Sequence, residues 1–371
     1  MAMASEVDEL ADFYRHLADA EFDGYCDLYA RIARAMADDP ALLARVVTMA
    51  PAAKVIPILL NAAVHHVVLG EPDSDLAACY RGDPGAATDP WPLFRSLVTE
   101  RFDELAALVA TRTIQTNEVG RSSILRPTLT AVARRFDRPL ALVELGPSAG
   151  LNLYFDRFGY RYGDGVELGD PAAAVQLECD VRADLAPPRD GAPPAVAQRL
   201  GVDLAPVDVT DPDACRWLEA CLWPRLTDRA DRLRAAIELA RSDPPDLRRG
   251  SALELLPELV ATSPPDTVVC VFATWVLAYF SHDDRAALGR LLDELGAERD
   301  LALVTMEYPS VAPGIDRPHR PAAVDQAKGA SLVGLASWHD GVRTAAPVAW
   351  CHAHGTWVDW VDPATADDPR G

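Results

Sequence analysis

Apolar residues in the first third of the chain recur with the 3.6-residue period of amphipathic helices. The period is clear over residues 7–17, 25–36, 93–109 and 124–136. We find no pattern typical of a strand before about residue 139. The first part of the chain is therefore predicted to be an all-helical domain.

After Pro139 the pattern changes to an alternation of strands and helices. Short, continuous apolar runs at 140–145, 267–280 and 301–308 are typical of strands that are buried on both faces. The last apolar segments, up to about residue 361, predict a hairpin or two late strands. This alternation indicates an α/β fold with a mostly parallel sheet that is covered by helices on both sides.

Helix signals between the strands are well defined. Ser281 is suited to the N-cap of a helix over 281–296, and Gly296 to its C-terminal cap. A region rich in Pro and Asp is predicted as an insertion between the second and third strands, and Asp211 begins a short helix within it. The predicted parts of the chain are a helical domain at 1–137, an α/β domain at 138–362 with its insertion at about 171–245, and a disordered tail at 363–371.

The charge of the chain limits its partners. There are 56 Asp and Glu against 35 Lys and Arg, which gives a formal net charge of −21. Such a surface repels phosphate backbones and anionic lipids, so we expect neither a nucleic acid nor a membrane as partner. The start of the chain does not resemble a signal peptide, and the seven scattered cysteines form no CxxC pair. We therefore expect a cytoplasmic protein without a zinc site.

The segment ELGPSAG, Glu144–Gly150, forms a glycine loop at the end of the first predicted strand. Glycines allow a ligand to approach the backbone closely, and an acidic residue about 20 positions further on commonly binds ribose hydroxyls in such folds. Asp164 has this spacing from Glu144. The G-x-G-x-x-G pattern is absent, however, because Ser148 stands where the middle glycine would be. The loop is therefore a poor match to a dinucleotide site.

The loop resembles instead the first motif of S-adenosylmethionine-dependent methyltransferases, in which it surrounds the amino-acid end of the cofactor. GSALELLP resembles the turn after the third strand of that fold, with Ser251 in place of the usual Asp, which weakens the adenine contact or moves it to Glu254. FATWVLAYFS resembles the fourth strand and its loop. The cofactor-binding residues that this resemblance implies are Glu144, Gly146, Ser148, Ala149, Gly150, Asn152, Asp164, Ser251, Ala252 and Phe272.

Several segments together resemble one uncharacterised bacterial family with a domain-of-unknown-function label, which is grouped with methyltransferase-like folds. These segments are QTNEVGR, ELGPSAGLNLYFDRFGYRYG, DVTDPDACRWLEACLWP and HGTWVDWV. The resemblance covers nearly the whole chain. It implies a Rossmann-like methyltransferase sheet, with the N-terminal helical domain acting as a lid, and supplies no substrate.

The same loop also fits G-x-S-x-G, the nucleophile elbow of α/β-hydrolases. In that alternative Ser148 attacks an acyl carbon, His354 or His319 is the base, and Glu307 or Asp316 orients the base. An elbow normally follows several strands, whereas a long helical region precedes this loop. We therefore keep the hydrolase as an outside alternative.

Two carboxylates are candidates for catalysis. Glu118 belongs to the polar cluster at 115–121, and Glu307 ends a strand on the edge where open α/β sheets bind ligands. His352 and His354 have a spacing that metal ligands use, but without further ligands nearby in sequence we expect no metal. The expected function is methyl transfer from S-adenosylmethionine to a small molecule. The alternatives are a non-catalytic metabolite-binding protein, or cyclisation or elimination on the same fold.

Overall fold

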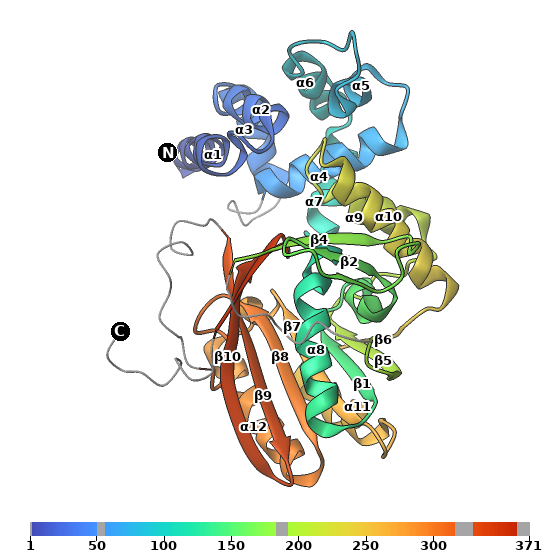
Figure 1. Ribbon diagram of the computed structural model, residues 1–371. Helices are drawn as coiled ribbons and strands as arrows, with labels where there is room; N and C mark the ends of the chain where they lie inside the picture. Colours follow the sequence, from blue (N-terminus) through green and yellow to red (C-terminus); the bar gives the residue numbers. More distant parts are fainter. Residues whose placement is uncertain (1, 50–55, 183–191, 316–328, 362–371) are drawn as a thin grey trace. The chain divides into compact units, whose positions relative to one another are not determined.

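The computed structural model divides the chain into two compact units (Figure 1). Unit 1 comprises residues 1–116 and 210–231, and unit 2 comprises residues 117–209 and 232–371. The predicted domain boundary at 137–138 lies inside unit 2. The residues that the structure describes are 2–49, 56–182, 192–315 and 329–361.

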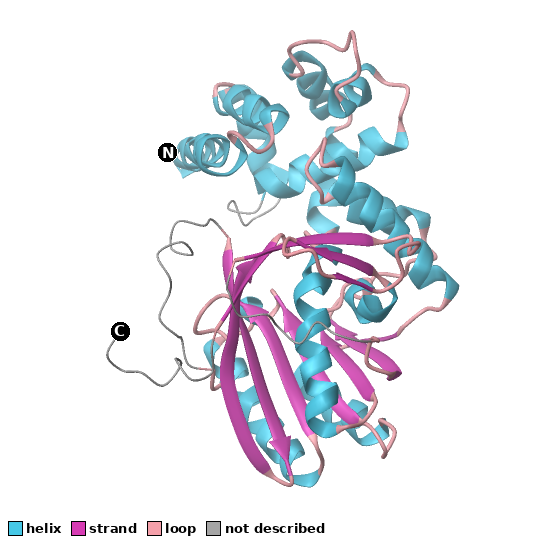
Figure 2. Ribbon diagram, in the orientation of Figure 1, coloured by secondary structure: helices cyan, strands magenta, loops and turns pink. Residues whose placement is uncertain are grey.

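Unit 1 is helical (Figure 2). None of the described residues before Leu140 lies in a strand, which confirms the prediction from the 3.6-residue period. No helix in the described part of the chain is both long enough and apolar enough to cross a membrane. The helices are α1 (Ala2–His16), the π-helical η1 (Leu17–Phe22), α2 (Asp27–Ala37), α3 (Pro40–Val46), η2 (Val47–Met49), α4 (Ile56–Gly70), α5 (Asp75–Arg81), α6 (Trp91–Glu100), α7 (Phe102–Thr111), α9 (Pro212–Ala220) and the start of α10 (Thr227–Ser242).

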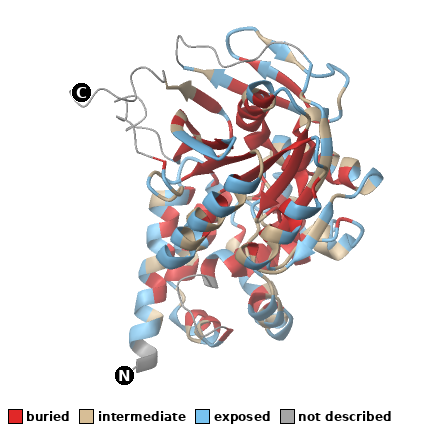
Figure 3. Cartoon of the chain, turned by 90° about the horizontal axis from the view of Figure 1, so that it is seen from below, coloured by how far each residue is buried: buried red, intermediate tan, exposed pale blue. Residues whose placement is uncertain are grey.

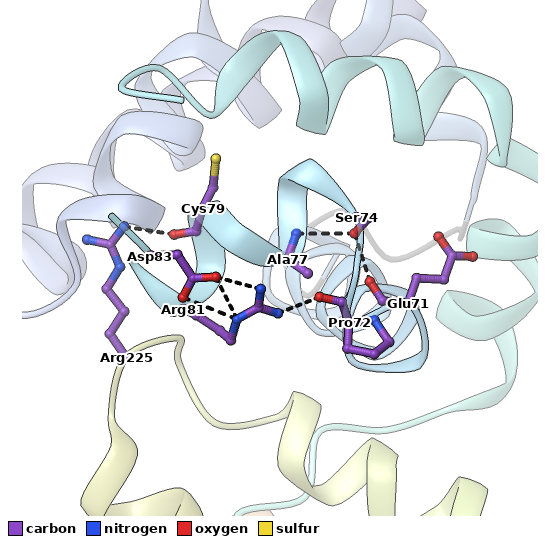
Figure 4. A network of polar contacts seen from close by, with 8 residues as sticks. All are labelled: Glu71, Pro72, Ser74, Ala77, Cys79, Arg81, Asp83 and Arg225. Carbon is purple, nitrogen blue, oxygen red and sulfur yellow. Dashed lines mark hydrogen bonds and ion pairs between the residues drawn. The ribbon is translucent and has the colours of Figure 1, made fainter. Parts of the chain in front are cut away.

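The late segment 210–231 is joined to the early helices of unit 1 by buried contacts. Trp217 belongs to the same apolar core as α2 and α4, and its indole N–H donates to the carbonyl of Thr113 at 2.9 Å. Arg225 donates to the carbonyl of Cys79 at the end of α5, at 2.8 Å (Figure 4). As predicted, the Asp211 side chain caps α9.

His65 and His66 are buried in the apolar helix α4 of unit 1. The Nδ1 atom of His65 is within 3.2 Å of the carbonyl oxygens of Ala220 and Leu222. Burial lowers the pKa of His65 to about 4. His66 Nε2 lies 3.2 Å from Asp213 Oδ1. Both histidines therefore hold α4 and α9 together within this unit.

The described residues of unit 2 form an 11-stranded, mostly parallel sheet in the order β3-β2-β4-β11-β10-β9-β8-β7-β1-β5-β6. Its strands are β1 (Leu140–Leu145), β2 (Gly159–Tyr162), β3 (Glu167–Leu168), β4 (Gln176–Val181), β5 (Val196–Asp203), β6 (Asp246–Arg249), β7 (Val268–Thr274), β8 (Leu301–Glu307), β9 (Ala330–His339), β10 (Val342–His352) and β11 (Trp357–Trp360). Its helices are η3 (Val119–Arg121), α8 (Ser122–Phe136), η4 (Leu151–Arg157), α11 (Ala252–Thr262), η5 (Leu277–Tyr279), α12 (His282–Glu298) and the remainder of α10.

The two faces of the central strands belong to different apolar cores, because successive side chains of a strand point to opposite faces. Leu140 and Leu142 of β1 pack with residues of α8. Ala141 and Val143 pack with residues of α11 and α12. Strands β1, β7 and β8 are buried along their whole length. Figure 3 shows buried strands in the interior of the protein. The predicted α/β architecture, with helices on both faces, is confirmed.

The position of the second parallel strand differs from the prediction. Strand β1 pairs with β7 on one side and with β5 on the other, and β5 lies inside the region predicted as an insertion. Strands β2, β3 and β4, which follow the glycine loop directly, form the opposite end of the sheet. Strand β5 was missed because its side chains are fully buried only near its end, so that it has no continuous apolar run.

Gly296 does not cap α12, contrary to the prediction. The helix continues to Glu298, and the side chain of Trp338 on β9 packs directly against the Gly296 Cα. Glycine is needed at this position because helix and strand approach closely, and a C-terminal turn is not involved. Ser281 is the N-cap, as predicted, and accepts a hydrogen bond from the Asp284 backbone at 3.0 Å.

Gly296→Ala should therefore destabilise the protein, although alanine is the better helix former. The added methyl group would overlap the Trp338 ring, and overpacking of this kind costs about 1–3 kcal/mol. Gly289→Ala on the same helix is the matched control, because its nearest contact would be Pro313 at 3.3 Å. Urea unfolding should show that Gly296→Ala clearly lowers the free energy of unfolding. The same measurement should show a change within about 1 kcal/mol for Gly289→Ala. Equal effects would contradict the packing explanation.

Candidate functional site

The carboxyl ends of five parallel strands, β6, β5, β1, β7 and β8, lie along one edge of the sheet. The chain adds β5 and β6 on one side of β1, and then β7 and β8 on the other. The junction of β1 and β7 is therefore a topological switch point. In open α/β sheets, ligands bind in the crevice at such a point.

The glycine loop follows β1 at this junction. Gly146, Ser148 and Gly150 all have positive φ values, of 64°, 54° and 71°. Three residues of the loop therefore have a left-handed backbone conformation. This conformation is strained for Ser148, whereas a glycine adopts it without strain. Val276, which follows β7, packs so closely on Gly146 that a Cβ there would overlap it.

The backbone N–H groups of the loop all have partners within the protein. These bonds are Gly146 to the Val202 carbonyl at 2.9 Å, Ser148 to Asp203 Oδ2 at 2.9 Å, Ala149 to Asn117 Oδ1 at 3.2 Å, and Gly150 to the Pro147 carbonyl at 2.8 Å. Pro147 has no N–H. The helix that follows, η4, is a short 3₁₀ segment and not an α-helix. The loop therefore offers no cradle of free N–H groups to a phosphate.

Glu144 lies at the end of β1 and is 2% exposed. Burial raises its pKa well above the usual range, and the nearby Asp203 carboxylate acts in the same direction. Arg121 and Asn152 oppose this rise because they favour the ionised form. The ionisation state of Glu144 therefore depends on the charges of the groups next to its buried carboxyl group.

Arg121 is the buried cation of the site, with 5% exposure. Its Nε donates to the carbonyl of Ala353 and its Nη1 to the carbonyl of Thr274, both at 3.0 Å. It also interacts electrostatically with Glu144 and Glu307. One guanidinium therefore links the ends of β7 and β10 and partly neutralises two buried acids.

Glu307 ends β8, as predicted, and is fully buried. Its Oε1 accepts hydrogen bonds from the backbones of Val276 and Leu277, at 2.8 and 2.9 Å. Burial raises its pKa, while these N–H groups and Arg121 act to lower it. The carboxylate thereby fixes the turn after β7, in which Trp275 has a φ of 59°.

Asp164 is not brought to the loop. It lies exposed in the turn between β2 and β3, at the other end of the sheet. The acid at the end of the strand beside β1 is Asp203, which the sequence analysis missed. Its two oxygens accept hydrogen bonds from the backbones of Ser148 and Ala205. The short run Leu200–Val202 before Asp203 was the sequence feature that could have indicated a strand ending at this acid.

The other predicted cofactor residues have varied surroundings. Ser251 follows β6, and the preceding Gly250 donates to the Asp203 carbonyl at 2.9 Å, so this turn adjoins the site. Ala252 and Phe272 are core residues, and Phe272 lies opposite Glu144 in the strand pairing. Asn152 is buried and accepts a hydrogen bond from Ser122 at 2.8 Å.

The predicted polar cluster at 115–121 is divided between the units, with residues 115–116 in unit 1 and residues 117–121 in unit 2. The Asn117 side chain contacts both Ser148 and Ala149 of the loop. Glu118 is buried and lies 3.4 Å from His354 Nδ1. The cluster thus joins the loop to the end of β10.

Aromatic residues border the same edge. Trp275 and Tyr308 follow β7 and β8, and their rings meet edge to face with centroids 4.3 Å apart. Tyr308 is half exposed and Tyr279 is 85% exposed. Exposed aromatic rings beside a crevice are suited to contact an apolar or planar ligand.

The surroundings of Ser148 do not resemble those of a hydrolase nucleophile. Its hydroxyl accepts a hydrogen bond from the Asn117 amide, which is not a base. The N–H of Ala149, which would form part of the oxyanion hole, donates to Asn117 as well. Two further predicted residues of that alternative, His319 and Asp316, lie outside the described residues, as does the predicted tail.

Comparison with protein families gives one match. A bacterial family described as "Uncharacterized protein conserved in bacteria (DUF2332)" matches residues 11–360, so the chain belongs to this family. This confirms the resemblance to an uncharacterised bacterial family. No curated protein matches the chain.

Proposed function

We propose that this member of the DUF2332 family transfers a methyl group from S-adenosylmethionine to a small molecule. The order β6-β5-β1-β7-β8 supports a Rossmann-like methyltransferase sheet, because it corresponds to the third, second, first, fourth and fifth strands of a doubly wound fold. The glycine loop would then lie where such folds bind their nucleoside ligand.

The observation that carries the proposal is the charge and hydrogen bonding of the loop. Its N–H groups are already bonded within the protein, and the carboxyl groups of Glu144 and Asp203 flank it. This environment repels a pyrophosphate and favours a cation. S-adenosylmethionine carries a positive sulfonium and no phosphate, so the residues present fit it better than they fit a dinucleotide.

The residues of the chain would have distinct roles. Asp203 would accept hydrogen bonds from the ribose hydroxyls, and the glycine loop would allow close approach of the adenosyl group. Glu144 would stabilise positive charge beside the loop. When bound, the cofactor supplies an activated methyl group, so the protein has mainly to orient the acceptor, exclude water and remove a proton. Glu307 holds the turn after β7 and would act by positioning.

Isothermal titration calorimetry with S-adenosylmethionine and S-adenosylhomocysteine tests the proposal. We expect both to bind and NAD to show no binding. Asp203→Asn should weaken both affinities by about 10-fold or more, because charge-assisted hydrogen bonds to the ribose are lost. Asp164→Asn is the matched control and should change neither. If neither adenosyl compound binds, the proposed function is wrong; labelling of Ser148 by a fluorophosphonate would favour the hydrolase instead.

A further inference from the structure

The turn 352–355 lies at the same edge of the sheet as the glycine loop. Strand β10 is antiparallel to β9, which is antiparallel to β8, so β10 ends on the side where β8 ends. Arg121 connects this turn to the site, because it binds the carbonyl of Ala353 and that of Thr274 at the end of β7. His354 is therefore placed at the edge of the sheet that carries the glycine loop, by the topology and by the buried hydrogen bonds of Arg121.

The turn also packs tightly on residues 118–123. The backbones of Gly120 and Gly355 approach so closely that a Cβ on either would overlap the other segment. The Ser123 hydroxyl lies 2.8 Å from the carbonyl oxygens of both glycines. The two segments therefore form one rigid element, and the side chains that they carry have a fixed relative position.

Glu118 and His354 face each other across this element. Glu118 is 4% exposed, and its Oε1 accepts a hydrogen bond from the Gly120 backbone at 2.9 Å. Its Oε2 lies 3.4 Å from His354 Nδ1, while the His354 side chain keeps 30% of its surface exposed. A buried carboxylate, anchored by the Gly120 backbone, thus lies at ion-pair distance from one imidazole nitrogen. This arrangement orients an imidazole and stabilises its protonated form.

We propose that His354 is the proton acceptor of the site, with Glu118 as its positioning residue. This inference rests on the proposed function and names its substrate class: a small molecule whose accepting atom is a hydroxyl oxygen or an ammonium nitrogen. Such a group must lose a proton, unlike a carboxylate or a thiolate, which needs no base at neutral pH.

The proton of the acceptor passes to His354 Nε2, and the freed electron pair of the oxygen or nitrogen forms the bond to the methyl carbon. The bond between sulfur and that carbon breaks, and its electrons stay on the sulfur, which becomes a neutral thioether. With a hydroxyl acceptor, the product is a neutral ether and the one positive charge is then on the imidazolium, beside Glu118. With an ammonium acceptor, the methylated nitrogen is still a cation, and the imidazolium carries the second positive charge. The other described charged or titratable groups facing His354 are His352, whose Nδ1 accepts from the His354 backbone at 3.1 Å, and Arg121 with its two buried acids.

Proton NMR of the full-length protein with labelled histidine rings tests the inference. His354→Gln assigns the signal, and the His354 pKa is then measured with S-adenosylmethionine bound and with S-adenosylhomocysteine bound. If the imidazole faces the reacting sulfur, the sulfonium charge should lower its pKa by about one unit relative to the neutral thioether. Glu118→Gln should lower it in both complexes. His339, at the opposite edge of the sheet, is the control and should not respond.

The outcomes separate the inference from the proposed function. If both compounds bind but the His354 pKa is the same in the two complexes, His354 is not at the reacting atoms and the inference is wrong, while the proposed function stands. If neither compound binds, both are wrong. His354→Gln should bind S-adenosylhomocysteine as the wild type does, whereas a loss of binding would point to a structural role and overturn the assignment.

Discussion

Replacing Arg121 by methionine is expected to lower the free energy of unfolding by about 3–5 kcal/mol, the cost of leaving buried charge without its partner. The guanidinium is 5% exposed, donates to two backbone carbonyls at 3.0 Å, and faces Glu144 and Glu307. Methionine fills much of the same volume but supplies neither charge nor donors. Both carbonyls would then be left with unmet hydrogen bonds in the interior.

Arg161→Met provides the matched control. Arg161 also contacts two carboxylates, Glu167 and Glu178, but its side chain is 60% exposed. Exposed ion pairs contribute little, so its loss should change stability by no more than about 0.5 kcal/mol. The loss of stability in Arg121→Lys should lie between those of the other two variants, because lysine keeps the positive charge but lacks the planar set of guanidinium donors. Urea unfolding measures all three; a loss below about 1 kcal/mol for Arg121→Met would contradict the role given to this residue.

The glycine loop could be predicted from sequence because the features that mark it are local. The apolar run of β1 and the glycines at 146 and 150 indicate a buried strand that ends in a glycine loop. The same holds for the N-cap Ser281 and for the all-helical character of the first third. Short-range periodicity and capping chemistry are sufficient for such features.

Strand β5, which pairs with β1 on the side away from β7, could not be found in this way. Asp164 has the expected spacing along the chain, yet β2, β3 and β4 intervene before the strand that pairs with β1. Asp203 lies 59 positions after Glu144, at the end of β5. Spacing rules assume an uninterrupted strand–helix–strand unit, and an inserted set of strands removes their basis.

The pairing of Glu118 with His354 is a long-range feature as well. Sequence indicated that the segments around both residues are distinctive, but not that they meet. Their contact depends on two glycine backbones, Gly120 and Gly355, that lie 235 positions apart. Gly296 illustrates the same limit: its neighbour Trp338 is on another strand, and a local interpretation therefore favoured a helix cap.

Glu144→Gln is expected to change both the pH dependence of stability and the binding of the cofactor. Burial raises the Glu144 pKa above the value that the unfolded chain has. The folded protein therefore holds a proton that the unfolded chain releases, so this contribution to stability is present at low pH and is lost as pH rises from about 4.5 towards the raised pKa. Glutamine does not titrate and removes this pH-dependent contribution, so the variant should become more stable relative to the wild type as pH rises. Thermal unfolding across this range, with the exposed Glu178→Gln as control, measures the difference.

The same substitution should weaken binding of S-adenosylmethionine more than binding of S-adenosylhomocysteine. A sulfonium near the loop favours the ionised form of Glu144, so binding to the wild type should release a proton and strengthen as pH rises. The neutral thioether lacks this coupling. With glutamine, we expect the preference for the sulfonium to fall by about 10-fold and its pH dependence to disappear. Calorimetry in two buffers of different ionisation enthalpy detects the proton. Equal losses for the two compounds would mean that Glu144 shapes the loop without sensing the charge of the ligand.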